Sequence, residues 1–244
     1  MTLDARPAAP LLEAQGLGVR VRGDRALLQG VDVSARAGEV VGVLGPNGAG
    51  KSTLLEAIVG LRDGVSGEVR VSGRPLTTFA ERARAFAYMP DDAALPEELS
   101  VRAVLGAAAG HDASRRLALG GLLNARAGRL SRGESKRVWL AWTLAQEKPL
   151  FLLDEPFGAF DPRQLREVLP VVRTAAERGA AVIATIHQMR TAELVADRLL
   201  LLASGRALAF GTLDELRAQV ALPGAPLDDV FLALLDAEGA DAAS

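Results

Sequence analysis

A glycine-rich segment at residues 45–53, GPNGAGKST, contains the first side chains whose types and spacing suggest chemistry. It fits the phosphate-binding pattern G-x-x-x-x-G-K-[ST], with two glycines, a lysine and a serine at the fixed positions. The backbone N–H groups of such a loop point at phosphate oxygens, and its glycines leave no side chain in the way. We therefore expect Lys51 to bridge the β- and γ-phosphates of a nucleotide, and the Ser52 hydroxyl to ligate Mg²⁺. The predicted nucleotide contacts in this segment are Gly45, Pro46, Asn47, Gly48, Ala49, Gly50, Lys51, Ser52 and Thr53.

Two acidic residues, Asp154 and Glu155, directly follow the apolar run at residues 150–153. That run has the pattern of a strand buried on both faces, and open α/β sheets bind ligands at the carboxyl ends of such strands. Asp154 suits a role at Mg²⁺, and Glu155 suits the base that polarises the attacking water. His187 ends a further apolar strand and is expected to reach the same γ-phosphate. The predicted catalytic residues are therefore Glu155, His187 and Lys51.

The elements that must position these residues are predicted from the apolar periodicity. Alternating polar and apolar residues at 11–37 and 65–72 predict an antiparallel layer beside the nucleotide. A helix is expected at 53–59, with Gly60 placed to end it. An Ala-rich helical pattern after Met89 predicts a short helical subdomain at about 92–135. Parallel strands, interleaved with helices, are expected at 40–44, 85–89, 150–153, 181–186 and 198–202.

Four motifs in a fixed order resemble those of the ATP-binding subunits of ABC transporters: GPNGAGKST at 45–53, LSRGE at 130–134, LFLLDEP at 150–156 and TIH at 185–187. The resemblance covers roughly residues 11–222. It implies an α/β fold, a P-loop NTPase core of the ABC type with an antiparallel β layer and a short α-helical subdomain. It also implies a dimer that encloses two ATP molecules, each between the phosphate loop of one copy and the LSRGE signature of the other. By motif match, Ser131 and Gly133 would contact the partner's γ-phosphate, and Asp161 would lie at the dimer seam.

Three positions depart from the family's usual pattern. Arg22 stands where an aromatic residue normally stacks on adenine, and a guanidinium can also stack on a ring face. Asp91 stands where Gln is usual, and its carboxylate is an acceptable Mg²⁺ ligand. The signature reads LSRGE where LSGGQ is commonest, so Arg132 and Glu134 replace Gly and Gln. Arg22 thus joins the predicted nucleotide contacts. The predicted metal ligands are Ser52, Asp154 and Asp91.

Several of these residues also have a structural interpretation. Ser131 and Glu134 form the S-x-x-E pattern of a capping box, so helix stability alone can explain Glu134. Asp161 precedes a proline and has the pattern of a helix N-cap, a role that is compatible with a place at the seam. Arg22 can be read as a solvated charge on an edge strand. For the glycine-rich loop we find no structural alternative.

Composition limits the other possibilities. The chain has 244 residues, 49% of them apolar, which is enough for one large domain with a substantial core. Its net charge of −2 gives no reason to expect a nucleic-acid partner. The absence of Cys is compatible with a reducing compartment. No apolar run approaches the roughly 20 residues that span a bilayer, and the first ten residues lack a signal-peptide core. Any membrane partner is therefore expected to be a separate chain.

These observations predict the organisation and the function of the chain. We expect an N-terminal extension at 1–10, an ABC ATPase domain at 11–236 and a flexible tail at 237–244. The expected function is ATP hydrolysis by an ATP- and Mg²⁺-dependent homodimer, cytoplasmic and peripheral on the inner face of the membrane, that powers a separately encoded permease. The segment LDDVFLALL is similar to bacterial exporter ATPases, which favours export. Two alternatives stay open: a soluble non-transport ATPase of the same family, and a nucleotide-binding scaffold that hardly hydrolyses ATP.

Overall fold

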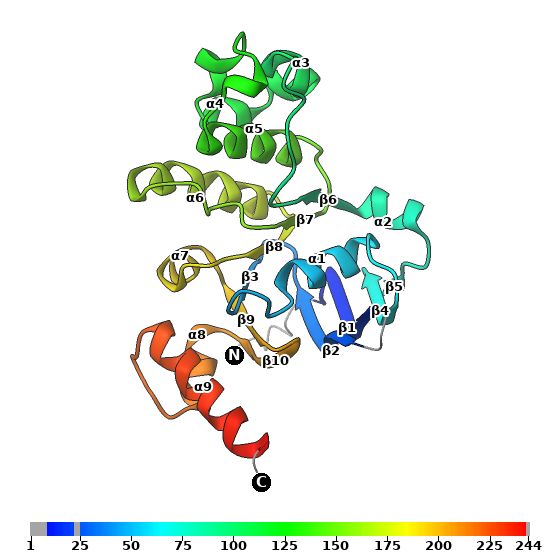
Figure 1. Cartoon of the computed structure of the whole chain (residues 1–244), viewed down its shortest axis with the longest axis vertical. Helices are drawn as coiled ribbons and strands as arrows, with labels where there is room; N and C mark the ends of the chain where they lie inside the picture. Colours follow the sequence, from blue (N-terminus) through cyan, green and yellow to red (C-terminus); the bar gives the residue numbers. More distant parts are fainter. Residues whose placement is uncertain (1–8, 22–24, 243–244) are drawn as a thin grey trace, which may run out of the picture.

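A six-stranded sheet forms the centre of the computed structural model, which describes residues 9–21 and 25–242 (Figure 1). The strand order is β10-β9-β3-β8-β7-β6, with β10 antiparallel to β9 and the other pairs parallel. The five predicted parallel strands are confirmed within one residue at each end. Because β3, β7 and β8 are parallel neighbours, the segments that follow them leave the sheet at one edge. The strands are β3 (Val40–Leu44), β6 (Phe86–Met89), β7 (Leu150–Leu153), β8 (Ala181–Thr185), β9 (Arg198–Ala203) and β10 (Arg206–Gly211).

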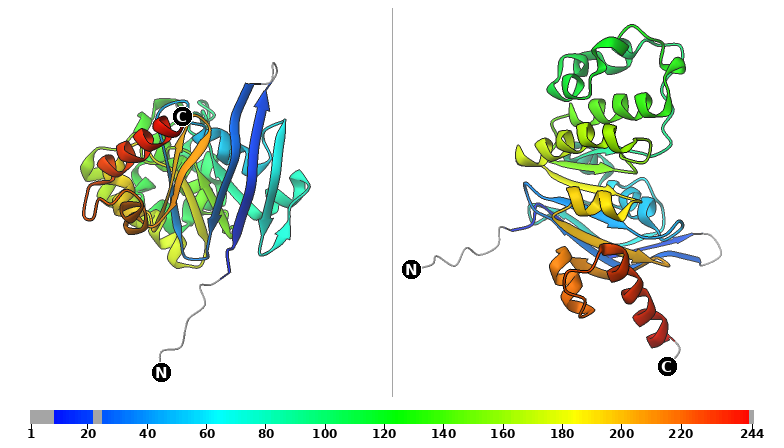
Figure 2. Two further views of the ribbon diagram at one scale, coloured as in Figure 1. Left: turned by 90° about the horizontal axis from the view of Figure 1, so that it is seen from below. Right: turned by 90° about the vertical axis from the view of Figure 1, so that its left-hand side faces the viewer.

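The predicted antiparallel layer is a second sheet with the order β2-β1-β4-β5. It lies beside the first sheet, as Figure 2 shows from below. The run expected at 11–37 forms two long strands, β1 (Leu12–Val21) and β2 (Arg25–Ala35). The other two strands are β4 (Val65–Val71) and the short β5 (Arg74–Pro75). This sheet places the start of β2 near the phosphate loop.

The central sheet separates two hydrophobic cores. Val41 and Val43 of β3 pack with the antiparallel sheet and the helix after β3, whereas Val40 and Leu44 pack on the opposite face. This division follows from strand geometry, since successive side chains point to opposite faces. All five residues of β3 are buried, as are all four of β7. Strands buried on both faces hold their carboxyl ends rigidly, which suits a site at that edge.

Helices cover both faces of the central sheet, and a group of short helices projects beyond it (Figure 1). The predicted subdomain at about 92–135 contains two short α-helices and three 3₁₀ segments, Gly106–Gly110, Leu119–Leu122 and Ala127–Arg129. Its predicted end at 135 cuts through α5, which runs nine residues further because apolar residues continue at helical spacing. The α-helices are α1 (Lys51–Val59), α2 (Phe79–Ala85), α3 (Val101–Leu105), α4 (Asp112–Arg116), α5 (Arg132–Leu144), α6 (Pro162–Glu177), α7 (Met189–Val195), α8 (Leu213–Gln219) and α9 (Leu227–Ala242).

The C-terminal end contains more regular structure than the sequence predicts. Residues 237–244 were expected to be a flexible tail, but α9 continues through them as far as Ala242. Three alanines at 237, 240 and 242 explain the difference, because alanine has the highest intrinsic helix propensity. The start of this helix packs into the core through Leu227, Val230 and Phe231. Of the extension expected at 1–10, only residues 9 and 10 are described, and they form no regular element.

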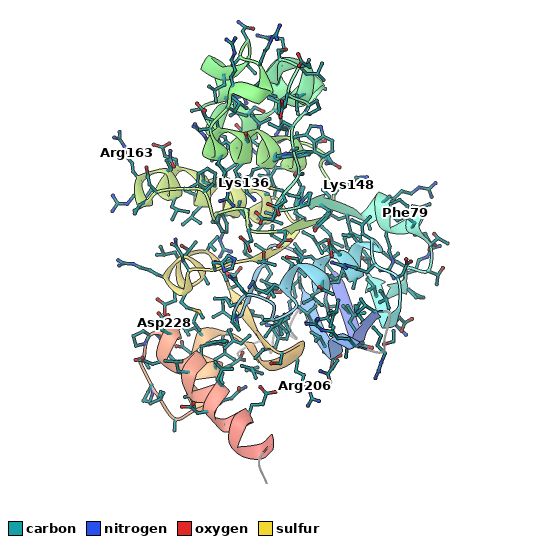
Figure 3. All side chains as sticks on the ribbon, in the orientation of Figure 1. Phe79, Lys136, Lys148, Arg163, Arg206 and Asp228 are labelled. Atoms are coloured by element: carbon teal, nitrogen blue, oxygen red, sulfur yellow. The ribbon has the colours of Figure 1, made fainter. Side chains whose placement is uncertain are left out.

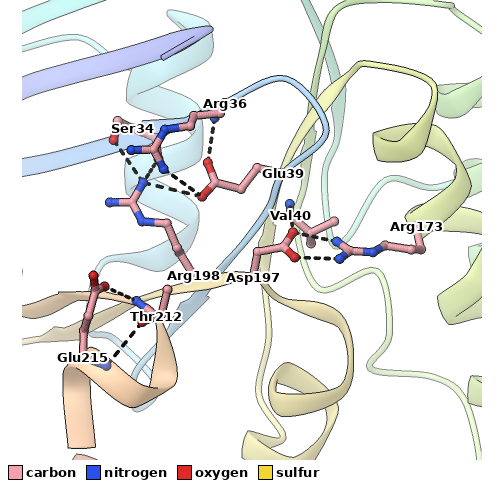
Figure 4. Close-up of polar contacts among 9 residues, drawn as sticks. All are labelled: Ser34, Arg36, Glu39, Val40, Arg173, Asp197, Arg198, Thr212 and Glu215. Carbon is pink, nitrogen blue, oxygen red and sulfur yellow. Dashed lines mark hydrogen bonds and ion pairs between the residues drawn. The ribbon is translucent and has the colours of Figure 1, made fainter. Parts of the chain in front are cut away.

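Charged residues form hydrogen bonds and ion pairs at the opposite edge of the central sheet, where β3 and β9 begin (Figure 4). Asp197 accepts two hydrogen bonds of 2.6 Å from the Arg173 guanidinium of α6 and one of 2.8 Å from the Val40 N–H. Burial raises the pKa of Asp197, but the hydrogen bonds from Arg173 and Val40 outweigh it, so the pKa lies below its ordinary value. On the other side of β3, Arg198 pairs with the buried Glu39 at 3.6 Å. This network fixes α6 and β9 on β3.

Candidate active site

A cavity of about 650 Å³ lies where β3 ends and α1 begins. Three parts of the chain form its walls: the start of β2, the glycine-rich loop with the first turn of α1, and the turn between β9 and β10. Glu155, after β7, closes one side. Six of the nine predicted loop contacts lie in this wall. The lining residues are Arg25, Ala26, Leu27, Asn47, Gly48, Gly50, Lys51, Ser52, Thr53, Glu155, Ser204 and Gly205.

The glycines of the loop allow its tight path. Gly45 has φ of 153°, and a Cβ there would lie 2.2 Å from the Leu202 carbonyl oxygen, so no larger residue fits. Gly50 has φ of 103° and caps α1 without any side-chain hydrogen bond. A Cβ on Gly48 would meet no atom within 4 Å, although its φ of 81° also favours glycine. The N–H groups at the start of α1 are thus left for a ligand, and the helix dipole favours an anion there.

Lys51 is a buried cation inside this loop. It is 6% exposed, and its ammonium donates hydrogen bonds to the carbonyl oxygens of Gly45 at 2.7 Å and Pro46 at 3.1 Å. Desolvation by burial lowers the pKa of Lys51, although the nearby carboxylates of Glu155 and Asp154 act in the opposite direction. A phosphate chain would supply the missing negative charge, so the loop holds Lys51 where a nucleotide needs it.

Thr185 links the two acidic residues, and sequence analysis missed it. Its hydroxyl donates a 2.6 Å hydrogen bond to Oδ1 of Asp154, which is 3% exposed. The same hydroxyl accepts a 2.7 Å hydrogen bond from the Glu155 N–H. Glu155 has a positive φ of 48°, which is uncommon for a residue with a side chain. The signal in the sequence was a polar residue at the end of an otherwise apolar strand.

His187 contacts Glu155, and its expected contact with a γ-phosphate stays a prediction. Its Nε2 is hydrogen bonded to Oε1 of Glu155. Both residues also line a second groove of about 320 Å³, together with Thr185 and Arg132. Glu155 therefore forms the boundary between the nucleotide cavity and this groove. A carboxylate held by an imidazole at that boundary can orient and polarise a water molecule.

Two predicted metal ligands fit Mg²⁺ at the edge of this cavity. Ser52 lines the cavity, and the Asp154 carboxylate is close enough to Lys51 to influence its pKa. Among residues 9–21 and 25–242, no three His, Cys, Asp or Glu side chains cluster as a metal site. Mg²⁺ in nucleotide sites commonly takes one or two protein oxygens and completes its shell with phosphates and waters. A hydroxyl and a carboxylate beside a phosphate loop fit that requirement.

Asp91 does not lie in this cavity wall. Its Oδ1 accepts a 2.6 Å hydrogen bond from the Lys136 ammonium of α5, and its carbonyl oxygen accepts a second at 3.0 Å. The carboxylate expected at Mg²⁺ is therefore engaged elsewhere in this structure. Its role as a metal ligand stays a prediction.

The signature residues lie apart from the cavity of their own chain. Ser131 caps α5, and its side chain and backbone form a reciprocal capping box with Glu134. Hydrogen bonds from the Ser131 backbone and hydroxyl lower the pKa of Glu134. Gly133 faces the Ala159 carbonyl oxygen, which would lie 3.3 Å from a Cβ. The capping interpretation is confirmed, and a contact with a second copy stays a prediction.

Asp161 also has the capping role that its sequence context predicted. Its Oδ1 accepts hydrogen bonds of 2.8 Å from the N–H groups of Arg163 and Gln164 at the start of α6. Its place at a dimer seam stays a prediction.

The expected base contact, Arg22, lies outside the described residues. Five other residues of the cavity wall were not predicted from the sequence, namely Arg25, Ala26, Leu27, Ser204 and Gly205. Gly205 approaches the backbone closely, because a Cβ there would lie 2.4 Å from the Leu27 carbonyl oxygen. Its N–H donates to the Ala49 carbonyl oxygen at 3.1 Å, which ties the β9–β10 turn to the loop. The Ser-Gly pair between two apolar strands was the available signal.

The part of the chain described by the structure contains no helix long and apolar enough to cross a membrane.

Comparison with known proteins identifies the family of this chain. Residues 28–158 match the family model described as ABC transporter. The hemin import ATP-binding protein HmuV of Streptomyces coelicolor is 42% identical over 233 residues, which cover 87% of this chain and 83% of the relative. The protein of the same name from Pseudomonas entomophila is 38% identical over 232 residues, or 87% of this chain and 91% of the relative.

A solved structure of the ATP-binding subunit of an ABC transporter has a TM-score of 0.81 and 32% sequence identity, and the match covers 92% of this chain and 99% of that one. The export that we expected is not supported by the Streptomyces and Pseudomonas relatives, since both are named for import. The phosphate loop, the paired acids and the histidine occur on the expected fold, and the chain belongs to the ABC transporter family as an ATP-binding subunit.

Proposed function

We propose that this chain is the ATP-hydrolysing subunit of an importer for hemin, working as a homodimer beneath a separately encoded permease. The observation that carries the direction and the substrate is the 42% identity with a hemin import ATP-binding protein across most of both chains. The observation that supports hydrolysis is the contact between His187 and Glu155 at the edge of the nucleotide cavity.

In this proposal the described residues divide the work. Lys51 and the N–H groups of the loop hold the phosphates, while Ser52 and Asp154 hold Mg²⁺. Mg²⁺ when bound neutralises charge on the phosphate oxygens. Glu155 orients and polarises the attacking water, and His187 fixes the Glu155 carboxylate. Thr185 keeps the two acids in place through its single hydroxyl.

The second copy completes each site. Ser131 and Gly133 lie at the start of α5, where N–H groups and a helix dipole can meet the γ-phosphate held by the partner. A symmetric dimer then has two such contacts. The permease would place the subunit on the cytoplasmic face of the membrane.

Direction can be tested by reconstituting the co-purified membrane partner and this subunit into proteoliposomes, with the subunit facing outward. An importer moves its substrate toward the ATP-hydrolysing side. When ATP is added outside, the transporter should therefore move hemin from the vesicle lumen into the medium, where external apomyoglobin captures it. ATP-driven accumulation of hemin inside the lumen would indicate export. The Glu155→Gln subunit serves as the inactive control.

A further inference from the structure

Lys136 is a buried cation on the helix that carries the signature. It is 5% exposed and lies four residues after the start of α5. The hydrogen-bond partners of its ammonium are both atoms of Asp91, the side-chain Oδ1 at 2.6 Å and the backbone oxygen at 3.0 Å. Figure 3 labels Lys136 between α5 and the central sheet. A buried ammonium is costly to leave unpaired, so this contact constrains the position of the helix.

A second side chain of α5 holds the same loop. Trp139 follows Lys136 by three residues and therefore lies on the same side of the helix. Its indole Nε1–H donates a 2.7 Å hydrogen bond to the Ala93 carbonyl oxygen. The loop after β6 is thus attached to α5 at two points, Asp91 and Ala93.

The other end of this loop is attached to the acidic residues. Met89, the last residue of β6, is paired with Leu153 of β7. Its carbonyl oxygen accepts a 2.7 Å hydrogen bond from the Asp154 N–H. Asp91 follows Met89 by only two positions in the chain. A short path of bonded contacts therefore runs from Asp154 through Met89, Asp91 and Lys136 to α5.

We infer that Asp91 is a positioning residue that acts through Lys136, rather than a ligand of Mg²⁺. Its ion pair sets where α5, and with it Ser131 and Gly133, stands relative to Asp154 and Glu155. The negative charge at Asp91 neutralises a buried ammonium, which explains why an acidic residue is needed at this position. The inference rests on the proposed function, because it assigns a role in positioning the signature for hydrolysis.

A double-mutant cycle tests whether the ion pair between Asp91 and Lys136 holds α5 against the loop after β6, and it needs no nucleotide. Asp91→Asn leaves Lys136 buried without a counter-charge, so the melting temperature should fall by about 4–8 °C, given that the Asp91 side chain is 24% exposed. Adding Lys136→Met removes the unpaired charge and should recover at least half of that loss. Lys148→Met is the matched control, since the Lys148 ammonium donates an exposed hydrogen bond of 3.1 Å to the Arg84 carbonyl oxygen. Strictly additive single effects would overturn the inference.

Kinetics separate positioning from metal binding and from simple instability. At a temperature where every variant is folded, kcat for ATP hydrolysis should fall by roughly 10- to 100-fold in Asp91→Asn, with KM for ATP unchanged within about twofold. The double variant should regain stability but not kcat. The Mg²⁺ concentration giving half-maximal turnover should stay within about twofold of wild type, whereas Ser52→Ala should raise it by about tenfold or more.

Two kinetic outcomes would overturn the inference. One is a Mg²⁺ requirement that rises in Asp91→Asn as it does in Ser52→Ala but not in Lys136→Met. The other is a double variant with wild-type kcat. A wild-type chain without any ATP turnover would instead contradict the proposed function, and the melting cycle would still decide whether the ion pair ties α5 to the loop.

Discussion

At the scale of single residues, Glu155 has three features that suit its proposed role as the catalytic base. It borders the nucleotide cavity, its carboxylate is hydrogen bonded to His187, and its backbone N–H is held by Thr185. The positive φ of 48° shows that the surrounding contacts impose an uncommon backbone conformation on it. A residue held in this way is already oriented before the substrate arrives.

Glu155→Gln should therefore bind ATP nearly as tightly as wild type but turn it over roughly 10²- to 10⁴-fold more slowly, because the amide cannot accept a proton from water. Calorimetric ATP titration and a phosphate-release assay check the two parts. Glu68→Gln on the antiparallel sheet is the control. Turnover equal to wild type would remove Glu155 from the chemistry and favour a different base.

The sequence could predict the site residues that belong to local motifs, but not those whose role depends on contacts between distant parts of the chain. Lys51, Asp154, Glu155 and His187 could be proposed from the sequence because their motifs are local and lie shortly after apolar strands whose ends are predictable. Thr185 was missed because its role depends on the pairing of β7 with β8, which joins residues about thirty positions apart. The ion pair of Asp91 with Lys136 was missed because it also joins residues far apart in the chain, 45 positions in this case.

At the scale of elements, two of the three glycines in the loop between β3 and α1 have different constraints. A Cβ on Gly45 would clash with a backbone oxygen at 2.2 Å, whereas a Cβ on Gly48 would enter open space. Gly45 thus serves the fold, and Gly48 leaves room for a ligand.

Gly45→Ala should therefore destabilise the protein severely, with a fall in melting temperature beyond about 10 °C, because backbone must move. Gly48→Ala should lower it by only about 2–8 °C, the cost of a left-handed backbone on a non-glycine residue. Its ATP affinity should nevertheless fall. Differential scanning calorimetry with and without ATP measures both effects, and equal melting temperatures for the two variants would contradict this account.

The hydrogen bonds that Asp197 accepts from Arg173 and Val40, at the sheet edge opposite the cavity, should make a pH-dependent contribution to the stability of the fold. The pKa of Asp197 is lower in the folded chain than in the unfolded chain, so its carboxylate stabilises the fold above the unfolded pKa of about 3.9. That stability is lost as pH falls through the folded pKa. Asp197 and Arg173 are each more than a third exposed, so the effect is modest.

Asp197→Asn should consequently destabilise the protein at pH 7 and progressively less as the pH falls below about 4. Urea unfolding of the variant and of wild type at pH 7, 5 and 3.5 checks this, with the exposed Asp63→Asn as control. A destabilisation that is the same at all three pH values would show that Asp197 acts through shape alone.

The elements themselves differ in how predictable they were. The parallel strands were located within one residue because continuous apolar runs mark strands buried on both faces. The helical subdomain was harder, since its short α and 3₁₀ segments have little periodicity and α5 crosses its predicted boundary. The helix over residues 237–242 was not predicted, because this part of α9 depends on helix propensity beyond its packed first turns.

At the scale of the whole molecule, the two groups of predicted nucleotide contacts, those of the phosphate loop and those of the LSRGE signature, lie in different parts of the chain. The cavity with Lys51 and Glu155 lies at the sheet edge, whereas Ser131 and Gly133 lie at the start of α5 and line no part of that cavity. In the proposed function, Ser131 and Gly133 of a second copy would contact the nucleotide held by this chain, and a symmetric dimer would make that contact twice.

The most direct test of this account is sedimentation velocity of the Glu155→Gln chain, in which ATP is bound but hydrolysed slowly. ATP with Mg²⁺ should convert it from monomer to dimer. Adding Ser131→Arg should abolish the dimer by placing bulk at the γ-phosphate contact, whereas Thr212→Arg, which removes the equivalent cap of α8, should leave it intact. A sedimentation coefficient that does not change with ATP, or a Ser131→Arg chain that still dimerises, would contradict the shared site.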